Sequence, residues 1–575
     1  QALEKFLATL RFESRPAAPA VSGLPNSTPP EDWHRPRSQA VRNDIRRWVY
    51  DFAADRGDPP APPETPPATV RGRRLRVGRG IPPMARGGDV VLPFGEFPLL
   101  PAYVRIRDRD YVIATDGSRV IAADPGRVKA GSSTVGVYWK YPDQPILRAM
   151  PGDPATGTTF GKPYTGVTVE GEHAFVTMFS RLESRPRDVN PQIPDTFEGT
   201  TAIKCIHIPT GKIVWDTDQS PLIEALKKSC EKFHDKNWSF SAPPLIRGDR
   251  VLLGVCSSPW GEQESRVLCL DRKTGRPLWT TFVSSLLGSP QNPWGSMGRL
   301  PVYPTMLAEQ GGTLYVQTNL GVLGALNPVN GSIQWLTRYR RWARRLQNSG
   351  GLEASFIRPA NAPLVWKGRV YALVQDHPQL MAFDGASGKS LELPAPPPDA
   401  PRPDWNGMMH LLGMVNDRLV ISGASSYVFN LSTSTAYPLT QANARGAGRG
   451  VIESDLVYMP CMASPAPGGA ASPAAAGVLS LFDTRTWKNL ESLPWKGPNE
   501  YGNLLVAGRA LVVATDKIVV YTDVETLRGE YAHRLHQSPP DPDVLLEFGD
   551  TMRENDRLEE AAETYLAFLA AAEGN

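Results

Sequence analysis

The sequence predicts an all-β fold, an eight-bladed β-propeller of four-stranded antiparallel blades with short α-helical segments at both ends. Three observations support this prediction. One hairpin pattern recurs with an unchanged register, a second hairpin pattern precedes most of its copies, and the pair repeats about every 50 residues. Because a four-stranded sheet cannot cover both of its faces alone, radial stacking around an axis is the stable arrangement.

The first hairpin runs from an apolar strand through a polar residue to a glycine four positions on and a tryptophan four positions further. Its three clear copies carry Gly211 with Trp215, Gly275 with Trp279, and Gly331 with Trp335. The glycine accepts the positive φ that a tight turn requires. The tryptophan is large enough to cover a neighbouring sheet. Each copy is therefore a hairpin that carries its own packing residue.

Weaker copies extend the series along the chain. Asp384 keeps its spacing to Gly388 but has Glu392 at the tryptophan position, and Asp523 keeps the acidic residue without the glycine. Acidic residues at this position, such as Asp271 and Asp384, are expected to hydrogen-bond with their own turns. They are therefore interpreted as structural residues of the repeat.

The second hairpin consists of a strand, a polar turn and a return strand, most clearly in residues 244–254. An early copy of the first hairpin, with an insertion, ends at Trp139. Two hairpins give four antiparallel strands per repeat. The predicted units span residues 103–142, 164–218, 240–284, 302–338, 360–394, 408–439, 449–495 and 502–531.

The predicted domains are an N-terminal helical segment (1–57), a Pro-rich linker (58–68), the propeller (69–535) and a C-terminal helix pair (536–575). The N-terminal segment is assigned as helical because Leu3, Phe6, Leu7 and Leu10 share one face, and Ser38 precedes a stripe of Val41, Ile45, Trp48, Val49 and Phe52. The last blade is expected to be completed by a strand from the N-terminal side. The candidates are residues 70–77 and 89–93, pairing near residues 511–521.

The acidic residue, the Thr-Gly pair and the tryptophan, repeated over residues 100–535, resemble the PQQ-like (quinoprotein) propeller repeat. That superfamily includes quinone-dependent alcohol dehydrogenases and the cofactor-free propeller lipoprotein of the outer-membrane barrel-assembly machinery. The resemblance implies a propeller and leaves the activity open, because one fold hosts many functions. The segment near the C-terminus resembles one tetratricopeptide (TPR) unit. The residues that match the spacing of a TPR are Leu546, Phe548, Gly549, Met552, Ala561, Ala562, Tyr565 and Phe568.

Composition excludes several classes of function. A formal net charge of +3 implies no general affinity for nucleic acid, and no apolar run reaches the roughly 18 residues that cross a bilayer. The chain begins at Gln1 without an initiator Met, so a processed or truncated species is expected. The five cysteines show no metal-ligand spacing. Cys205 and Cys269 are expected to be small buried residues, and pairing of Cys230 with Cys256 stays open.

The resemblance also implies what an active quinoenzyme would need, namely a vicinal cysteine pair over the cofactor and a Ca²⁺ site beside a catalytic Asp. No two cysteines are adjacent in this sequence, and no corresponding Ca²⁺-binding stretch is identifiable. We therefore expect no catalytic residues, no cofactor and no metal. A PQQ-dependent oxidoreductase of alcohols or sugars remains the alternative.

Two features are candidates for partner binding. Trp260 and Trp294 lie in two predicted loops. Each tryptophan is expected either to stack on a sugar, a quinone or a partner side chain, or to pack under its own loop. Arg341, Arg344 and Arg345 are expected on one face of a short helix, either as a fork for carboxylates or phosphates or as a solvated surface. The sequence thus predicts a non-enzymatic protein-interaction scaffold of the bacterial cell envelope. It would act in the periplasm or another extracytoplasmic compartment within a multi-protein assembly, and glycan binding through the two tryptophans is a further alternative.

Overall fold

The computed structural model describes most of the chain from residue 45 onward. The described residues are 45–52, 55, 99–126, 136–143, 166–179, 201–218, 238–240, 242–257, 262–287, 304–341, 344–345, 353–354, 358–393, 405–433, 435–439, 444–463, 477–495, 502–515, 517–535 and 542–573. Within these ranges, no helix is long and apolar enough to cross a membrane.

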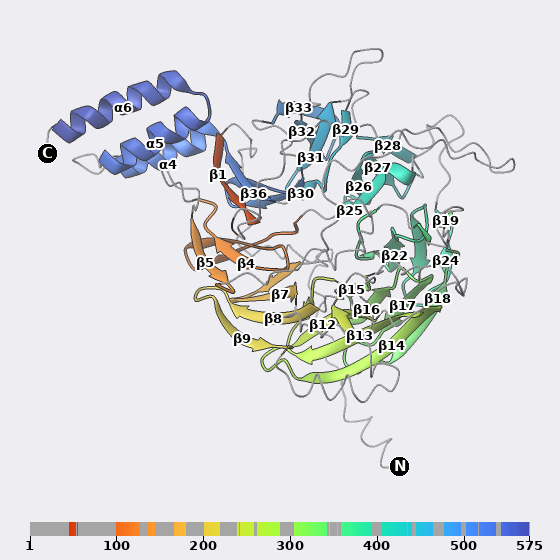
Figure 1. Cartoon of the computed structure of the whole chain (residues 1–575). Coiled ribbons are helices and arrows are strands. Elements are labelled where there is room, and N and C mark those ends of the chain that lie inside the picture. Colours follow the sequence, from red (N-terminus) through yellow and green to blue (C-terminus); the bar gives the residue numbers. More distant parts are fainter. Residues whose placement is uncertain are drawn as a thin grey trace, which may run out of the picture.

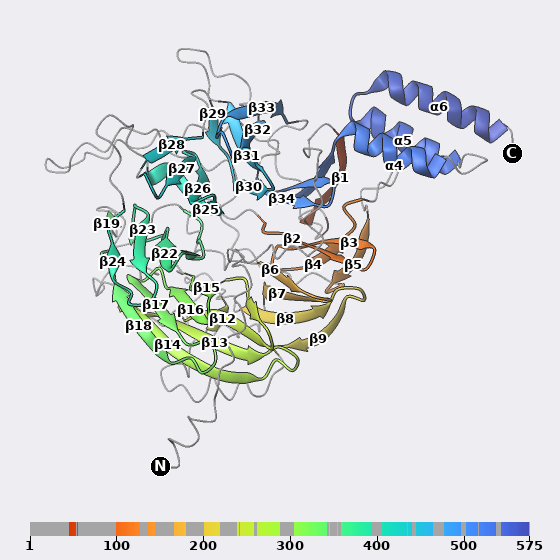
Figure 2. The same ribbon diagram turned by 180° about the vertical axis from the view of Figure 1, so that it is seen from behind.

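Eight antiparallel sheets of four or five strands form a ring (Figure 1), and the reverse view shows the same closed order (Figure 2). The predicted eight-bladed propeller is therefore confirmed. Blade 1 holds β2 (Ala102–Ile106), β3 (Arg109–Thr115), β4 (Val120–Ala123) and β5 (Val137–Tyr141). Blade 2 holds β6 (Val167–Glu170), β7 (His173–Phe179), β8 (Thr201–His207) and β9 (Lys212–Asp216).

The next three blades follow the same order. Blade 3 holds β10 (Trp238–Phe240), β11 (Leu245–Arg247), β12 (Arg250–Ser257), β13 (Glu262–Asp271) and β14 (Pro277–Leu287). Blade 4 holds β15 (Met306–Gln310), β16 (Thr313–Gln317), β17 (Val322–Leu326) and β18 (Ile333–Arg338). Blade 5 holds β21 (Leu364–Trp366), β22 (Arg369–Ala372), β23 (Met381–Asp384) and β24 (Ser390–Leu391). Between blades 4 and 5, β19 (Arg344–Arg345) pairs with β20 (Glu353–Ala354).

The ring is completed by three further blades. A 3₁₀ turn, η4 (Trp405–Gly407), leads into blade 6, which holds β25 (Met408–Val415), β26 (Arg418–Gly423), β27 (Tyr427–Asn430) and β28 (Thr435–Pro438). Blade 7 holds β29 (Ala444–Gly446), β30 (Val451–Glu453), β31 (Leu456–Ala463), β32 (Gly477–Asp483) and β33 (Asn489–Pro494). Blade 8 holds β34 (Asn503–Ala507), β35 (Ala510–Ala514), β36 (Lys517–Thr522) and β1 (Ile45–Asp51).

Burial differs between the middle and the outer strands for a simple reason. The middle strands β4 and β35 are buried along their whole length, because both of their faces pack against neighbouring blades. The outer strands β18 and β33 keep many exposed positions, since the blades diverge toward the rim of the ring. This matches the sequence pattern, with continuous apolar runs in the middle strands and mixed runs in the outer ones.

The N-terminal strand β1 closes the ring. It is the outer strand of blade 8 and pairs antiparallel with β36, from Ile45 opposite Thr522 to Asp51 opposite Lys517. A closing strand from the N-terminal side was expected, but the assignment of this part of segment 1–57 as helix was wrong. A bulge between Arg46 and Trp48 shifts the alternation, so the apolar spacing imitates a helical stripe. The alternative closing segments, 70–77 and 89–93, lie outside the described residues.

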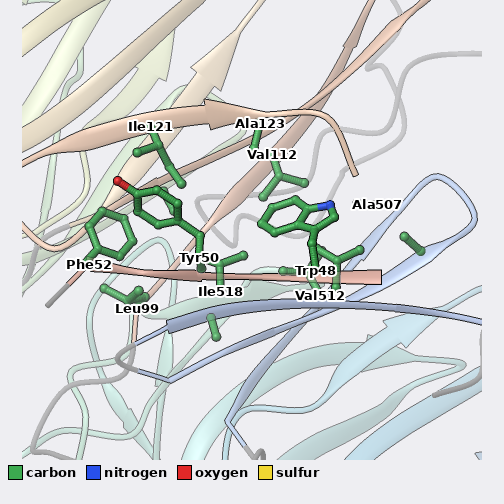
Figure 3. Close-up of a cluster of buried hydrophobic side chains, with 14 residues drawn as sticks. Trp48, Tyr50, Phe52, Leu99, Val112, Ile121, Ala123, Ala507, Val512 and Ile518 are labelled. Carbon is green, nitrogen blue, oxygen red and sulfur yellow. The ribbon is translucent and has the colours of Figure 1, made fainter. Parts of the chain in front are cut away.

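The closing strand carries three aromatic side chains into the contact between blades 8 and 1. Trp48 and Tyr50 of β1 and Phe52, directly after it, are almost completely buried and lie against the apolar side chains of blade 1 (Figure 3). Beyond the strand, Asp55 forms ion pairs with Arg119 and Lys140 of blade 1. The first and last blades are therefore joined through the N-terminal segment by apolar packing and by charge.

Three helices follow the last blade, namely α4 (Val524–Leu535), α5 (Pro542–Glu554) and α6 (Leu558–Glu573). The propeller therefore ends at Thr522, whereas the sequence placed α4 inside it. The reason is local: Asp523, interpreted above as a degenerate repeat acid, accepts a hydrogen bond of 2.8 Å from the Thr526 backbone N–H and caps α4. α5 and α6 lie within the segment that was predicted to be helical.

A buried histidine in blade 6 makes stability depend on pH. His410 on β25 is only 8% exposed, and burial, aided by Arg449, lowers its pKa from 6.5 to about 3. Below pH 6.5 the unfolded chain takes up a proton that the folded chain excludes, so stability is present above that pH and is lost as pH falls. Between pH 6.5 and 4.5 the free energy of unfolding should therefore fall by about 2–3 kcal/mol more in the unaltered protein than in His410→Gln. Denaturant unfolding at both pH values measures it, and identical pH dependence in both proteins would contradict it.

Candidate protein-binding surfaces

The tryptophans of the repeat pack on the glycines of the next blade. A Cβ atom added to any of these glycines would lie less than 3 Å from the ring of the preceding tryptophan. The pairs are Trp139 with Gly211, Trp215 with Gly275, Trp279 with Gly331, and Trp335 with Gly388. The repeat therefore encodes contacts between neighbouring blades. Gly388 contacts Trp335, the last tryptophan of the series, because the copy that contains Gly388 has Glu392 at its own tryptophan position.

Hydrogen bonds reinforce three of these contacts. The indole N–H donates to a backbone carbonyl of the following blade, from Trp139 to Ile208 (2.6 Å), from Trp215 to Arg272 (2.8 Å) and from Trp335 to Gly385 (3.0 Å). In these three contacts the face of the indole ring packs against the next blade, and the N–H at the edge of the ring forms a hydrogen bond to it. These repeat residues hold the propeller together.

The turn aspartates bond to their own turns. Asp271 accepts hydrogen bonds from the backbone N–H and the hydroxyl of Thr274, at 2.8 and 2.6 Å. Asp384 does the same with Ser387, at 2.8 and 2.6 Å. The side-chain hydrogen bonds lower the pKa of both carboxyl groups, with Thr274 the largest cause for Asp271 and Ser387 for Asp384. Both aspartates are thus kept ionised as turn acceptors.

Arg341 lies just after β18, and Arg344 and Arg345 form the strand β19, so the predicted short helix over these three arginines is wrong. The Nε of Arg341 is 2.8 Å from Oδ2 of Asp376, while the Tyr339 hydroxyl donates to Oδ1 at 2.8 Å. The Asp376 side chain is 1% exposed, and burial raises the pKa of both Asp376 and Tyr339. The ion pair and the tyrosine hydrogen bond satisfy this buried carboxyl group, so Arg341 acts in packing blades 4 and 5 together.

The side chains of the other four predicted partner-binding residues are not described, so the structure does not place them beside Arg341. Arg344 and Arg345 form β19, whose side chains lie outside the described residues. Trp260 and Trp294 also lie outside the described part of the chain. Their role as binding residues stays a prediction.

Two buried polar side chains between blades 5 and 6 were not recognised from the sequence. The guanidinium of Arg358 donates hydrogen bonds of 2.9–3.1 Å to four backbone carbonyls, those of Val374, His377, Pro378 and Trp405. Burial lowers its pKa to about 10. Asn361 accepts from the Leu411 N–H and donates to the Met409 carbonyl, both at 2.9 Å. No motif marks such residues, because their partners are backbone groups distant in sequence.

The cysteines behave as small core residues. Burial raises the pKa of Cys205 and Cys269 to about 12 and that of Cys461 to about 11. These thiols are therefore protonated and inert in the core. Cys230 lies outside the described residues, so whether it pairs with Cys256 stays open. Over the described ranges, no three His, Cys, Asp or Glu side chains gather as a possible metal site.

A buried arginine fastens the C-terminal helices to the propeller. The side chain of Arg47, on β1, is 1% exposed; it donates to the Gly126 carbonyl of blade 1 and pairs with Glu530 of α4, both at 2.7 Å. Next to it, the Arg46 N–H donates to Oδ1 of Asn555 at 2.8 Å, and the Asn555 amide donates to the Arg46 carbonyl at 3.1 Å. The helices are thus held against the closing strand by paired polar contacts.

Exposed large apolar side chains gather at two places in the described structure, while Tyr437 on β28 and Leu490 on β33 are exposed singly. One is the outer rim of blades 2 to 4, with Val214, Leu278, Phe282, Val329, Ile333 and Leu336. The other is α6, where Leu558, Leu566 and Leu569 are 65%, 67% and 53% exposed. Together with exposed Ala562 they form one helical face, called the α6 stripe below. Single exposed apolar residues are common on protein surfaces, whereas a continuous stripe suggests a binding surface.

Solved structures similar to this chain include BamB from Moraxella catarrhalis, with 16% identity, a TM-score of 0.40, and coverage of 73% of this chain and 96% of that one. The computationally designed Ika8 protein has 11% identity, a TM-score of 0.39, and coverage of 75% and 98%. A europium-containing methanol dehydrogenase has 12% identity, a TM-score of 0.31, and coverage of 72% and 74%. No curated protein matches the chain in sequence.

A protein-family model described as "Outer membrane protein assembly factor BamB" matches residues 153–396 and 263–463. The matches end before α4, and the comparisons do not support the TPR resemblance of the C-terminal helices. Within the propeller they include the three clear copies of the repeat, with Gly211 and Trp215, Gly275 and Trp279, and Gly331 and Trp335. Because the two ranges together cover more than half of the chain, the protein belongs to the BamB-like family of PQQ propellers.

Proposed function

We propose that this protein is a non-enzymatic interaction scaffold of the bacterial cell envelope, which binds other proteins outside the cytoplasm. Membership of the BamB-like family supports both the class of function and the compartment. The observation that carries the proposal is the helical unit on blade 8. It presents the apolar α6 stripe to solvent, while the contacts of Arg46 and Arg47 hold it on the closing strand.

The arrangement suits a scaffold for a physical reason. A propeller closed by its own N-terminal strand is a rigid platform, because that strand joins the first and last blades. Surfaces fixed on such a platform lose little conformational entropy when a partner binds. The indole N–H groups of the repeat bond between blades and its aspartates bond within their own turns. The outer rim and α6 carry exposed apolar side chains, which suit them for binding a partner.

Photo-crosslinking in the native host tests the proposal. A photoreactive residue is placed at Leu566 on α6, at Phe282 on the outer rim and, as a control, at Gly368 in a surface turn with no heavy atom within 4 Å of an added Cβ. We expect discrete protein adducts from Leu566 or Phe282 and none from Gly368. A chain that gives no protein adduct from either surface, and that is extracted under mild conditions only as a monomer, would refute the scaffold function.

The alternatives have separate assays. Adding PQQ and Ca²⁺ would raise the melting temperature and produce dye-linked oxidation of an alcohol or sugar if the protein were a quinoenzyme. Retention on polysaccharide that disappears in the Trp260→Ala and Trp294→Ala double variant would indicate glycan binding. We expect neither result.

A further inference from the structure

We infer that the α6 stripe binds an amphipathic helix of a partner protein, one whose apolar face is flanked by lysine or arginine side chains. This inference rests on the proposed scaffold function and names the partner class for one of its surfaces. It is carried by three independent observations on α6 and α5, which are the spacing of the stripe, the charge around it and its fixed position.

The spacing of the stripe is that of a helix-packing face. Leu558, Ala562, Leu566 and Leu569 follow one another at intervals of four, four and three residues, so they line one side of the helix. This side differs from the one that already packs inside the protein, where Ala561 is only 2% exposed. α6 therefore has two apolar faces, one filled by α5 and one open. The small side chain of Ala562 lets a second helix approach closely.

The charge around the stripe selects the partner. Residues 542–573 contain nine carboxylates and two arginines, a formal charge of −7 in a chain whose total is +3. Arg557 and, from α4, Arg528 bond to Glu560 at 2.5 and 2.6 Å, and Arg553 pairs with Asp550 at 3.2 Å. Glu559 and Glu563 are exposed beside the stripe, and no ion pair to either occurs among the described residues. A basic flank on the partner helix would complement this acidic border and increase the rate of association.

The helix is held in place before any partner arrives. Gly549 of α5 lies against the ring of Tyr565 of α6, and the Tyr565 hydroxyl donates to Asp550 at 2.6 Å. Asn555, at the end of α5, is bonded to the Arg46 backbone of the closing strand. Ile45 of that strand is fully buried among side chains of all three helices, including Leu527, Met552 and Ala561. The stripe is thus presented on a preorganised surface, which favours binding by limiting the entropy that is lost.

Two synthetic helical peptides and the full chain test the inference. Both peptides carry leucines at helical spacing; one has lysines beside the leucines and the other has glutamates in the same positions. We expect the lysine peptide to bind the unaltered protein about 3- to 10-fold more tightly, with a difference that shrinks at high salt. Fluorescence anisotropy of the labelled peptides measures this. Equal binding of both peptides, or none, would overturn the inference.

Three variants locate the site. The double variant Leu566→Gln and Leu569→Gln removes the apolar centre of the stripe. It is expected to weaken the binding of the lysine peptide at least tenfold. Glu559→Lys with Glu563→Lys is expected to reverse the preference between the two peptides. Leu490→Gln, at a 58% exposed position on β33, is the matched control and leaves binding unchanged. Circular dichroism verifies that each variant is folded; folded variants that bind like the unaltered protein would contradict the site.

Other occupants give distinguishable results. Self-association that disappears in the Leu566→Gln and Leu569→Gln variant would mean that a second copy covers the stripe. Peptide binding that appears only after deletion of residues 1–44 would mean that the chain covers its own stripe. Either outcome overturns the partner assignment. If crosslinking finds protein partners on the outer rim while neither peptide binds α6, the scaffold function stands and this inference fails.

Discussion

Replacing Trp48 with alanine is expected to lower the free energy of unfolding by about 3–5 kcal/mol. The Trp48 side chain is 3% exposed and lies in the contact that closes the ring (Figure 3). Its neighbours in that cluster come from both sides of the closure, with Val112 from blade 1 and Val512 from blade 8. The truncation leaves a cavity between two rigid sheets, which cannot collapse to fill it. Denaturant unfolding measures the loss.

Leu490→Ala is the control for this change. Leu490 lies on the outer strand β33 and is 58% exposed, so its truncation is expected to change stability by less than about 0.5 kcal/mol. A pair of deletions extends the test. Removing residues 1–44 leaves β1 in place, whereas removing residues 1–52 takes away the strand, the aromatic cluster and the contacts of Arg46 and Arg47 with the helices. We expect only the longer deletion to abolish cooperative unfolding; equal stability of the two proteins, or of Trp48→Ala and Leu490→Ala, would contradict the closing role of β1.

The blades were predictable because the repeat encodes the contact between blades. A glycine that must lie under the tryptophan of the preceding blade cannot be exchanged freely, so the register survives along the chain. The period of the pattern therefore predicts the number of sheets and their order. Gly388 illustrates the logic: its own copy has lost the tryptophan, yet the glycine is still required by Trp335 of blade 4.

The closing strand was not predictable in the same way, because it belongs to no repeat. Its apolar residues occur at spacings of three and four, which indicate a helix when read along the chain. The β-bulge between Arg46 and Trp48 produces that spacing in a strand. Only the pairing with β36, more than 460 residues away in sequence, distinguishes the two structures.

The candidate site residues were predictable to different degrees for the same reason. The arginine cluster was interpreted from local spacing alone, which cannot reveal that Asp376, on the next blade, binds Arg341. Arg358 and Asn361 carry no sequence signal, since backbone carbonyls of any residue can accept their hydrogen bonds. The amphipathic character of α6 is visible in the sequence, but the structure is needed to show which of its two apolar faces remains open.

The tryptophan-on-glycine contact predicts a large difference between two otherwise similar glycines. Gly331 and Gly368 have nearly the same backbone conformation, with φ of +72° and +73°. Alanine at either position has to adopt a left-handed conformation, at a cost of roughly 1–2 kcal/mol. At Gly368 an added Cβ has no heavy atom within 4 Å, whereas at Gly331 it would lie less than 3 Å from the Trp279 ring and from the Thr281 hydroxyl. We expect Gly331→Ala to destabilise by about 1–3 kcal/mol more than Gly368→Ala.

A double-mutant cycle shows whether the excess comes from the tryptophan. In a Trp279→Ala background the ring is gone, so Gly331→Ala is expected to be destabilising only by its backbone conformation and the remaining contact with Thr281. The coupling free energy between positions 279 and 331 should therefore be at least about 1 kcal/mol, while positions 279 and 368 should be additive within about 0.5 kcal/mol. Denaturant unfolding of the single and double variants gives both values. Equal destabilisation by Gly331→Ala and Gly368→Ala would show that the glycines serve only their turns, and that the recurring register does not hold neighbouring blades together.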